Sequence, residues 1–165
     1  MPILTGRKKE LIIRGGHNID PKIIEEAMHA HPAVQMAAAV GRPDAKAGEL
    51  PVLYYQGDAI QEEELSSFAA THIAERAAIP KAFIRLDALP VTGVGKIHKV
   101  TLNMMEIERT IRAEAEAKGI AIRELEVLQD NHRGVFAHLR LASNRDQATM
   151  RHALGLYAFS VDYQT

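Results

Sequence analysis

One segment, Leu89 to Lys99, constrains the fold of this chain more strongly than any other. It places a proline and two glycines between an apolar run at 82–87 and a long amphipathic pattern that starts near residue 101. Because proline cannot donate to a sheet and glycine adopts backbone conformations that other residues avoid, the segment is predicted to be a loop between a strand and a helix. Lys96 lies near the tip of this loop, and its mobile, positively charged amine suits contact with a phosphate or a carboxylate.

The loop resembles the C-terminal lysine loop of the adenylate-forming superfamily. That superfamily contains acyl-CoA synthetases, the adenylation domains of peptide synthetases, and luciferases, and its pattern is roughly Leu-Pro-x-Thr-x-x-Gly-Lys-Ile-x-Lys/Arg. An isolated Gly-Lys pair would favour an ordinary surface turn, whereas a match at every fixed position favours the resemblance. The matching residues are Leu89, Pro90, Thr92, Gly95, Lys96, Ile97 and Lys99.

A second motif lies near the start of the chain, in residues 6–25. It reads as a polar turn, a short apolar strand, a glycine turn and a capped helix, with Asp20 as the N-cap and Pro21 at the first helical position. The same segment resembles the hinge motif of the adenylate-forming family. The matching residues are Gly6, Arg7, Lys9, Ile12, Gly16, Ile19, Pro21, Ile24 and Glu25.

The resemblance implies a role for the lysine loop. Lys96 is expected to be the catalytic lysine of the adenylation step, in which it bridges the carboxylate and the nucleotide. Thr92, Gly93 and Gly95 are expected to support the loop that carries it.

The resemblance also implies roles for the first motif. Arg7 is expected to bind the nucleotide, at its ribose, and Lys9 is expected to be the hinge. The loop of Gly15, Gly16 and His17 is expected to face the pantetheine of coenzyme A in the second half-reaction.

The apolar patterns predict an α+β fold, in which helices pack on a small mixed or antiparallel sheet. The buried stripe of the first helix is predicted to comprise Ile23, Ile24, Ala27 and Met28. Predicted strands lie at 10–14, 34–41, 50–56 and 82–87, and predicted helices lie at 21–31, 61–76 and 101–118, the last ending at Gly119.

Residues 119–165 are predicted to form a β-β-α-β extension of unknown role, which follows a first domain at 1–118. Ser143 and Asp146 resemble a capping box at the start of the helix in this extension. We interpret the extension as an added structural layer. A partner-binding or subunit-contact role is the alternative.

Composition excludes several classes of function. The chain has 165 residues, a net charge of −1 and no cysteine. The charge balance gives no case for nucleic acid or a membrane surface as partner, and the absence of cysteine excludes disulfides and thiolate metal sites. Its eight histidines are scattered without metal-ligand spacing, so no metal site is expected. With no secretory signal and no membrane-spanning run, a cytoplasmic location is expected.

The resemblance therefore implies the C-terminal small domain of an AMP-forming acyl-CoA synthetase. ATP, Mg²⁺ and coenzyme A are the implied cofactors, and a carboxylic acid is the implied substrate. The implied partner is a large N-terminal domain of the same polypeptide, which would bind most of the ATP and acyl group and without which the chain is expected to be inactive. The alternative is a stand-alone, non-catalytic domain that binds a partner or a nucleotide.

Overall fold

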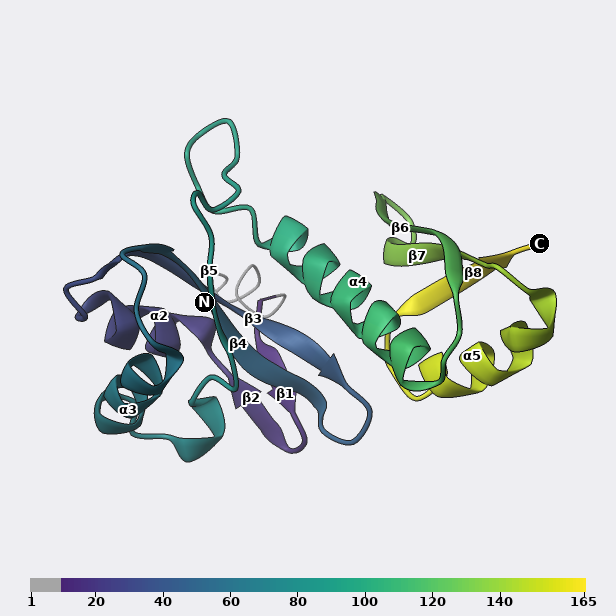
Figure 1. Cartoon of the computed structure of the whole chain (residues 1–165). Coiled ribbons are helices and arrows are strands. Elements are labelled where there is room, and N and C mark those ends of the chain that lie inside the picture. The colour runs from purple at the N-terminus through teal and green to yellow at the C-terminus, as the bar shows by residue number, and fades with distance from the viewer. Residues whose placement is uncertain (1–9) are drawn as a thin grey trace.

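The computed structural model describes residues 10–165 (Figure 1), so Gly6, Arg7 and Lys9 lie outside the described residues. The described chain contains two small sheets joined by one long helix, α4 (Lys99–Ala117). The expected α+β class is confirmed.

The first sheet has the strand order β2-β1-β4-β3. Its strands are β1 (Ile12–Arg14), β2 (His17–Ile19), β3 (Val34–Asp44), β4 (Gly48–Gly57) and β5 (Phe83–Arg85). β5 pairs in parallel with the second half of β4, and all other pairs in this sheet are antiparallel. The sheet is therefore mixed, as the sequence predicts.

Both faces of the first sheet are covered. Helices α2 (Pro21–His29) and α3 (Glu62–His72) pack on one face, where Ile24, Met28 and Leu65 are buried. The first turns of α4 pack on the other face, where Leu102 meets Tyr54. Burial on both faces explains why the neighbouring strands β3 and β4 contain continuous runs of apolar residues.

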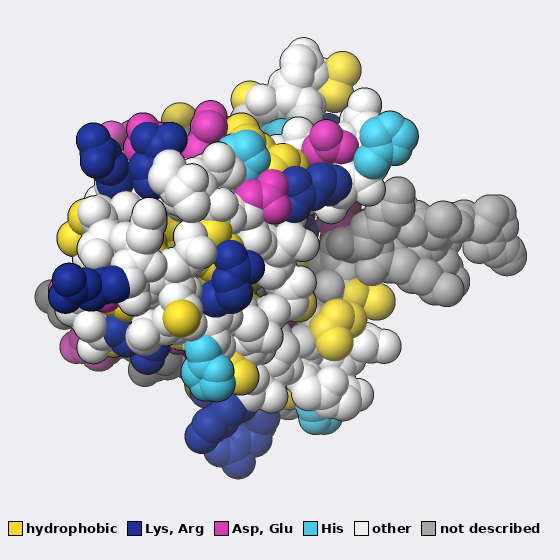
Figure 2. Space-filling view, turned by 90° about the vertical axis from the view of Figure 1, so that its right-hand side faces the viewer, with side chains coloured by type: hydrophobic (Ala, Val, Ile, Leu, Met, Phe, Trp, Pro, Cys, Tyr) yellow, Lys and Arg dark blue, Asp and Glu magenta, His cyan; other side chains and the backbone are white. Residues whose placement is uncertain are grey.

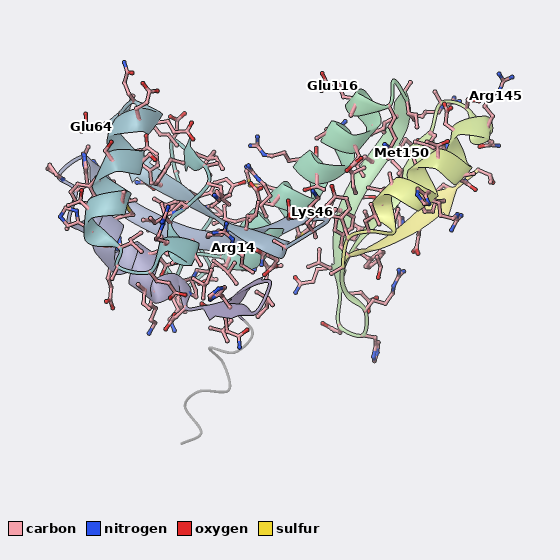
Figure 3. The ribbon with its side chains drawn as sticks, turned by 90° about the horizontal axis from the view of Figure 1, so that it is seen from below. Arg14, Lys46, Glu64, Glu116, Arg145 and Met150 are labelled. Carbon is pink, nitrogen blue, oxygen red and sulfur yellow. The ribbon has the colours of Figure 1, made fainter. Side chains whose placement is uncertain are left out.

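The second sheet has the order β6-β7-β8, formed by β6 (Ile122–Asp130), β7 (Gly134–Leu141) and β8 (Ser160–Gln164). Helix α5 (Gln147–Leu154) connects β7 to β8, which run parallel. Figure 3 shows Met150 on the inner side of α5 and Arg145 at the outer tip of this unit, in agreement with the full burial of Met150. The β-β-α-β order agrees with the sequence prediction.

Helix α4 contributes to both hydrophobic cores. Leu102 belongs to the core of the first sheet, whereas Ile107, Ile111 and Ala115 belong to the core of the second. The helix ends as predicted, because Gly119 takes a left-handed φ of 67° and the Ile120 N–H donates to the Ala115 carbonyl at 2.8 Å. The predicted boundary between residues 118 and 119 therefore lies at the end of α4, a helix that also packs in the core of the second sheet.

Two predictions about the helices α3 and α2 differ from the structure. The helix predicted at 61–76 ends at His72, because Ile73 takes an extended conformation that buries its side chain in the core. A 3₁₀ turn at Arg76–Ala78 follows. Ile23, predicted to be buried, is 48% exposed, because the buried face of α2 follows Ile24 and Met28 one turn apart.

Helix starts show one success and one correction. The Asp20 carboxylate accepts a hydrogen bond from the Lys22 N–H at 3.0 Å, with Pro21 at the first helical position, as predicted. Ser143 does not form the predicted capping box with Asp146. Its hydroxyl accepts from the Arg145 N–H and caps a short 3₁₀ turn, Asn144–Asp146, that precedes α5.

Candidate functional site

The lysine loop connects β5 to α4 and projects from the top of the molecule in Figure 1. Its two arms are closed by backbone hydrogen bonds from Thr92 N–H to the Lys96 carbonyl, at 2.6 Å, and from His98 N–H to the Pro90 carbonyl, at 2.8 Å. The Thr92 hydroxyl accepts a further bond from the Lys96 N–H at 3.2 Å. Gly95 completes the turn with a φ of 83°, which favours glycine. The loop is therefore a hydrogen-bonded turn.

The base of this loop is buried and its tip is exposed. Leu89 is buried, and its N–H donates to the Gln56 side chain at 3.1 Å. Val94 is 82% exposed, and Lys96 is also exposed. Among residues 10–165, no side chain forms an ion pair or hydrogen bond with the Lys96 amine. The Lys96 amine is therefore accessible to a ligand or to another domain.

The predicted pantetheine-facing loop is the turn of the β1–β2 hairpin. Gly15 takes a φ of 57°, and its N–H donates to the Ala47 carbonyl at 2.7 Å, which ties the hairpin to the β3–β4 turn. His17 pairs with Arg14 across the hairpin. This turn lies at the lower side of Figure 1, far from the lysine loop at the top, so the structure does not bring Lys96 and Gly16 together.

A cavity of about 570 Å³ opens beside this hairpin. Its lining carries four basic side chains, Arg14, His17, Arg76 and Lys81. Arg14 is fixed by a 2.8 Å hydrogen bond from its Nη1 to the Ala77 carbonyl. A cavity with this lining is suited to an anionic ligand.

The two motifs are joined by two ion pairs of Lys99. The Lys99 amine lies 2.7 Å from Glu25 Oε2 and 3.4 Å from Glu10 Oε1. The same Glu25 oxygen accepts a hydrogen bond from the Ala39 N–H of β3 at 2.9 Å. Lys99 is the first residue of α4, so this contact connects the end of the lysine loop to the segment at the start of the described chain.

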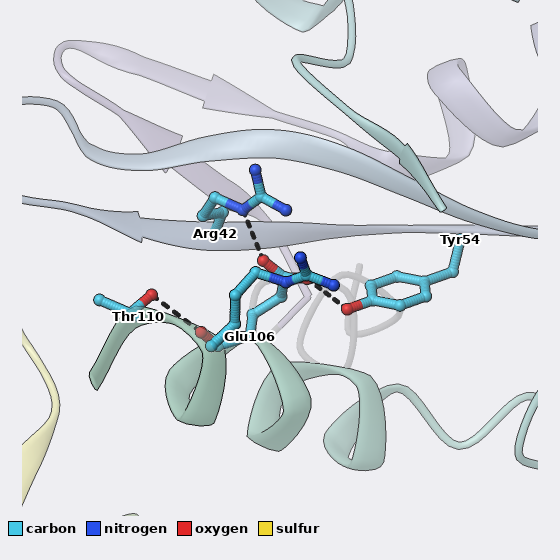
Figure 4. A network of polar contacts seen from close by, with 5 residues as sticks. Arg42, Tyr54, Glu106 and Thr110 are labelled. Carbon is cyan, nitrogen blue, oxygen red and sulfur yellow. Dashed lines mark hydrogen bonds and ion pairs between the residues drawn. The ribbon is translucent and has the colours of Figure 1, made fainter. Parts of the chain in front are cut away.

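A second polar network lies inside the interface between α4 and the first sheet (Figure 4). Glu106 is fully buried; it accepts from Arg42 Nε at 2.6 Å and from the Tyr54 hydroxyl. Arg109 Nε lies 3.7 Å from the same carboxylate. Burial, and then the hydrogen bond to Glu106, raise the pKa of Tyr54 far above its usual range.

Sequence reasoning did not find three of these features: the Glu25–Lys99 pair, the Glu106 network and the basic cavity. One signal was available for Glu106, which falls in line with Leu102 and Thr110 on the buried face of α4, where a charge is unusual. The pairing of Glu25 with Lys99 leaves no local signal, because the two residues are distant in sequence.

The sequence predicts neither a metal site nor a membrane-spanning segment. Within residues 10–165, no group of three or more His, Asp or Glu side chains could hold a metal ion. None of the helices described is long and apolar enough to span a bilayer. On the face in Figure 2, charged side chains of both signs are dispersed.

Comparison with known proteins indicates the family to which this chain belongs. A family model described as the AMP-binding enzyme C-terminal domain matches residues 23–96. Marinolic acid–CoA ligase of Pseudoalteromonas sp. is 41% identical over 148 residues, covering 87% of this chain and 23% of that protein. The putative acyl-CoA synthetase YngI of Bacillus subtilis is 42% identical over 108 residues, covering 64% of this chain and 20% of that protein.

Solved structures give the same result. Mycobacterium tuberculosis fatty acyl CoA synthetase aligns with a TM-score of 0.56 at 33% identity, covering 59% of this chain and 20% of that one. Apo MatB from Rhodopseudomonas palustris aligns with a TM-score of 0.57 at 33% identity, covering 60% of this chain and 20% of that one.

The matches differ in how much of this chain they cover. A match over 87% of the chain extends past residue 118 wherever it begins, so the Pseudoalteromonas ligase shares at least part of the second unit. The chain spans about a quarter or less of the length of these relatives. This chain belongs to the adenylate-forming, AMP-binding enzyme family, and it matches the C-terminal domain of that family's enzymes.

Proposed function

We propose that the chain is the mobile C-terminal domain of an AMP-forming acyl-CoA ligase and that Lys96 is its adenylation lysine. The observation that carries this proposal is the hydrogen-bonded loop that presents the Lys96 amine without a partner among residues 10–165. Within this family, such a loop supplies a cation to an active site that lies on another domain. The roles proposed below for Arg7, Lys9 and the turn at residues 15–17 rest on the resemblance of residues 6–25 to the hinge motif.

In the first half-reaction, a carboxylate oxygen attacks the α-phosphorus of ATP. The bond to the bridging oxygen breaks, and pyrophosphate leaves with the acyl-adenylate as product. Both reactants are anionic, and negative charge grows on the phosphate oxygens. A lysine amine between them offsets the repulsion and stabilises the charge. The exposure of Lys96 on a closed turn suits this role.

In the second half-reaction, the sulfur of coenzyme A attacks the acyl carbonyl carbon and AMP leaves. The hairpin turn of Gly15, Gly16 and His17 would line the path of the pantetheine. The neighbouring cavity supports this role, because Arg14, Arg76 and Lys81 lie in its wall and coenzyme A is rich in phosphate. The hairpin and the lysine loop lie far apart on the domain, so one rotation would exchange them at the active site.

Two proposed residues lie before the described part of the chain. Lys9 is proposed as the hinge that absorbs the backbone rotation, and Arg7 as a ligand of the nucleotide ribose. The segment that follows them starts at Glu10, which contacts Lys99. The proposed hinge would thus lie next to the Glu10–Lys99 ion pair, at the end of the lysine loop.

The domain requires a partner for catalysis. A large N-terminal domain of the same polypeptide would hold most of the ATP, the Mg²⁺ ion and the acyl group. Magnesium would offset the charge on the phosphates. The basic side chains that line the cavity beside the hairpin, Arg14, Arg76 and Lys81, support a phosphate-binding part for this domain.

The test compares the isolated 165-residue chain with the same chain joined to a large nucleotide-binding domain of the family. We expect pyrophosphate exchange that depends on a carboxylic acid, and thioester formation with coenzyme A, from the joined protein only. Exchange by the isolated chain would show that the nucleotide site is complete within it. Inactivity of both forms, with nucleotide bound tightly by the isolated chain, would favour the non-catalytic domain.

A further inference from the structure

Lys99 occupies a position that helix physics disfavours. It is the first residue of α4, where unpaired backbone N–H groups create positive potential and acidic side chains are preferred. The first turn of α4 contains no acidic residue, and no side chain caps its backbone. A cation placed against the helix dipole requires compensation from outside the helix.

The compensation comes from two carboxylates on other elements. Glu25 of α2 lies 2.7 Å from the Lys99 amine, and Glu10 lies 3.4 Å from it. The side chains of Lys99 and Glu25 are only 18% and 16% exposed, so water screens this pair less than a surface pair. Glu25 is itself held by the Ala39 N–H of β3. The amine is therefore anchored to α2, to β3 and to residue 10.

This anchor lies three residues after Lys96. The lysine loop closes on itself through its own hydrogen bonds, including the one between His98 N–H and the Pro90 carbonyl. A loop closed in this way moves as one body, so its direction depends on how its two ends are held. Leu89 holds the first end in the core, and Lys99 holds the second.

We propose that Lys99 is a positioning residue, whose ion pair with Glu25 and Glu10 sets the direction in which the loop presents Lys96 for adenylation. This inference rests on the proposed function of Lys96. The thiol attack uses the opposite side of the domain, so loss of the anchor affects adenylation selectively. If Lys99 had only a structural role, its replacement would instead lower the rates of both half-reactions and the stability of the domain together.

The test measures both half-reactions separately in the full-length ligase that carries this domain. Lys99→Met should lower kcat for carboxylate-dependent pyrophosphate exchange about tenfold, since displacements near 1 Å cost up to about a hundredfold. Thioester formation from pre-made acyl-adenylate should stay within about twofold of wild type. Lys99→Arg should restore exchange to within about threefold, because it keeps the charge.

Two further variants separate positioning from folding. Glu25→Gln keeps an acceptor for the Ala39 N–H but removes the charge, so it should show the same selective defect in adenylation. It provides the test if Lys99→Met folds poorly. Arg112→Met is the matched control, because it removes an exposed ion pair, with Glu108, farther along α4 and should leave both half-reactions unchanged. Lys96→Ala is measured alongside.

The outcomes distinguish the two proposals. A selective defect in Lys99→Met and Glu25→Gln, with rescue by arginine, supports positioning. Equal losses in both half-reactions, or full exchange activity in both variants while Lys96→Ala is inactive in exchange, would overturn it and leave the role of Lys96 intact. Full exchange activity in Lys96→Ala itself would overturn the proposed function and this inference together.

Discussion

Replacing Glu106 by alanine should lower the free energy of unfolding of this chain by about 3 kcal/mol, because the change leaves two polar partners without an acceptor in the α4 interface. The Tyr54 hydroxyl is fully buried, and an unpaired buried hydroxyl costs about 1–3 kcal/mol. The side chain of Arg42 is 27% exposed and can partly rehydrate, so its share is well below the 3–5 kcal/mol of a fully buried broken pair. The lost methylene adds about 0.8 kcal/mol.

Urea denaturation followed by circular dichroism measures this change, provided that the slope of the transition stays constant. For a chain of this size, about 3 kcal/mol corresponds to a fall of roughly 6–12 °C in the thermal midpoint. Glu106→Gln keeps the volume and one acceptor and should lose about half as much. Glu108→Ala is the control, because it removes an exposed pair with Arg112 on the same helix, worth about 0.5 kcal/mol.

The refuting result is a loss below about 1 kcal/mol for Glu106→Ala, no larger than the loss for Glu108→Ala. It would show that Arg42 and Tyr54 find other partners when the carboxylate is removed. The network of Figure 4 would then contribute little to holding α4 against the first sheet.

Three further predictions concern the hinge, the basic cavity and the second unit. Lys9→Pro fixes φ at the proposed hinge and should leave one half-reaction active and the other inactive; activity of both would place the rotation elsewhere. Combined Arg76→Glu and Lys81→Glu should raise KM for coenzyme A about tenfold with KM for ATP unchanged, and equal effects on both would assign the cavity to another role. Burial and the hydrogen bond to Glu114 raise the pKa of Tyr157 from 10.0 to about 12, so its stabilising contribution is complete below pH 10 and disappears as the pH rises to about 12. Tyr157→Phe should flatten the stability–pH curve in that window, and an unchanged slope would contradict this origin.

Local chemistry accounts for what the sequence predicted well. Asp20 and Pro21 specify the start of α2, and Gly119 specifies the end of α4, because each acts through hydrogen bonds or backbone angles of its immediate neighbours. The turn around Gly95 follows from the same kind of signal. The roles of Arg7 and Lys9 stay predictions, since both lie outside the described residues.

Long-range contacts account for what the sequence did not predict. The pair of Glu25 with Lys99 joins α2 to α4, and nothing near either residue specifies the other. Strand β2 exists because Ile19 is buried beside Ile12 in the core of the first sheet, although the strand itself is short. The basic cavity likewise forms only when the segments that carry Arg14 and Lys81 come together in the fold.

The most direct test of the central proposal is the division of activity in Lys96→Ala between the two half-reactions of the full-length ligase. The account predicts a loss of about a hundred- to a thousandfold in carboxylate-dependent pyrophosphate exchange, which corresponds to about 3–4 kcal/mol of lost transition-state stabilisation. Thioester formation from pre-made acyl-adenylate should be unchanged, as should both half-reactions of the control Lys22→Ala, which removes another exposed lysine. Equal losses in both half-reactions, or an undiminished exchange rate, would contradict the assignment of Lys96 as the adenylation lysine.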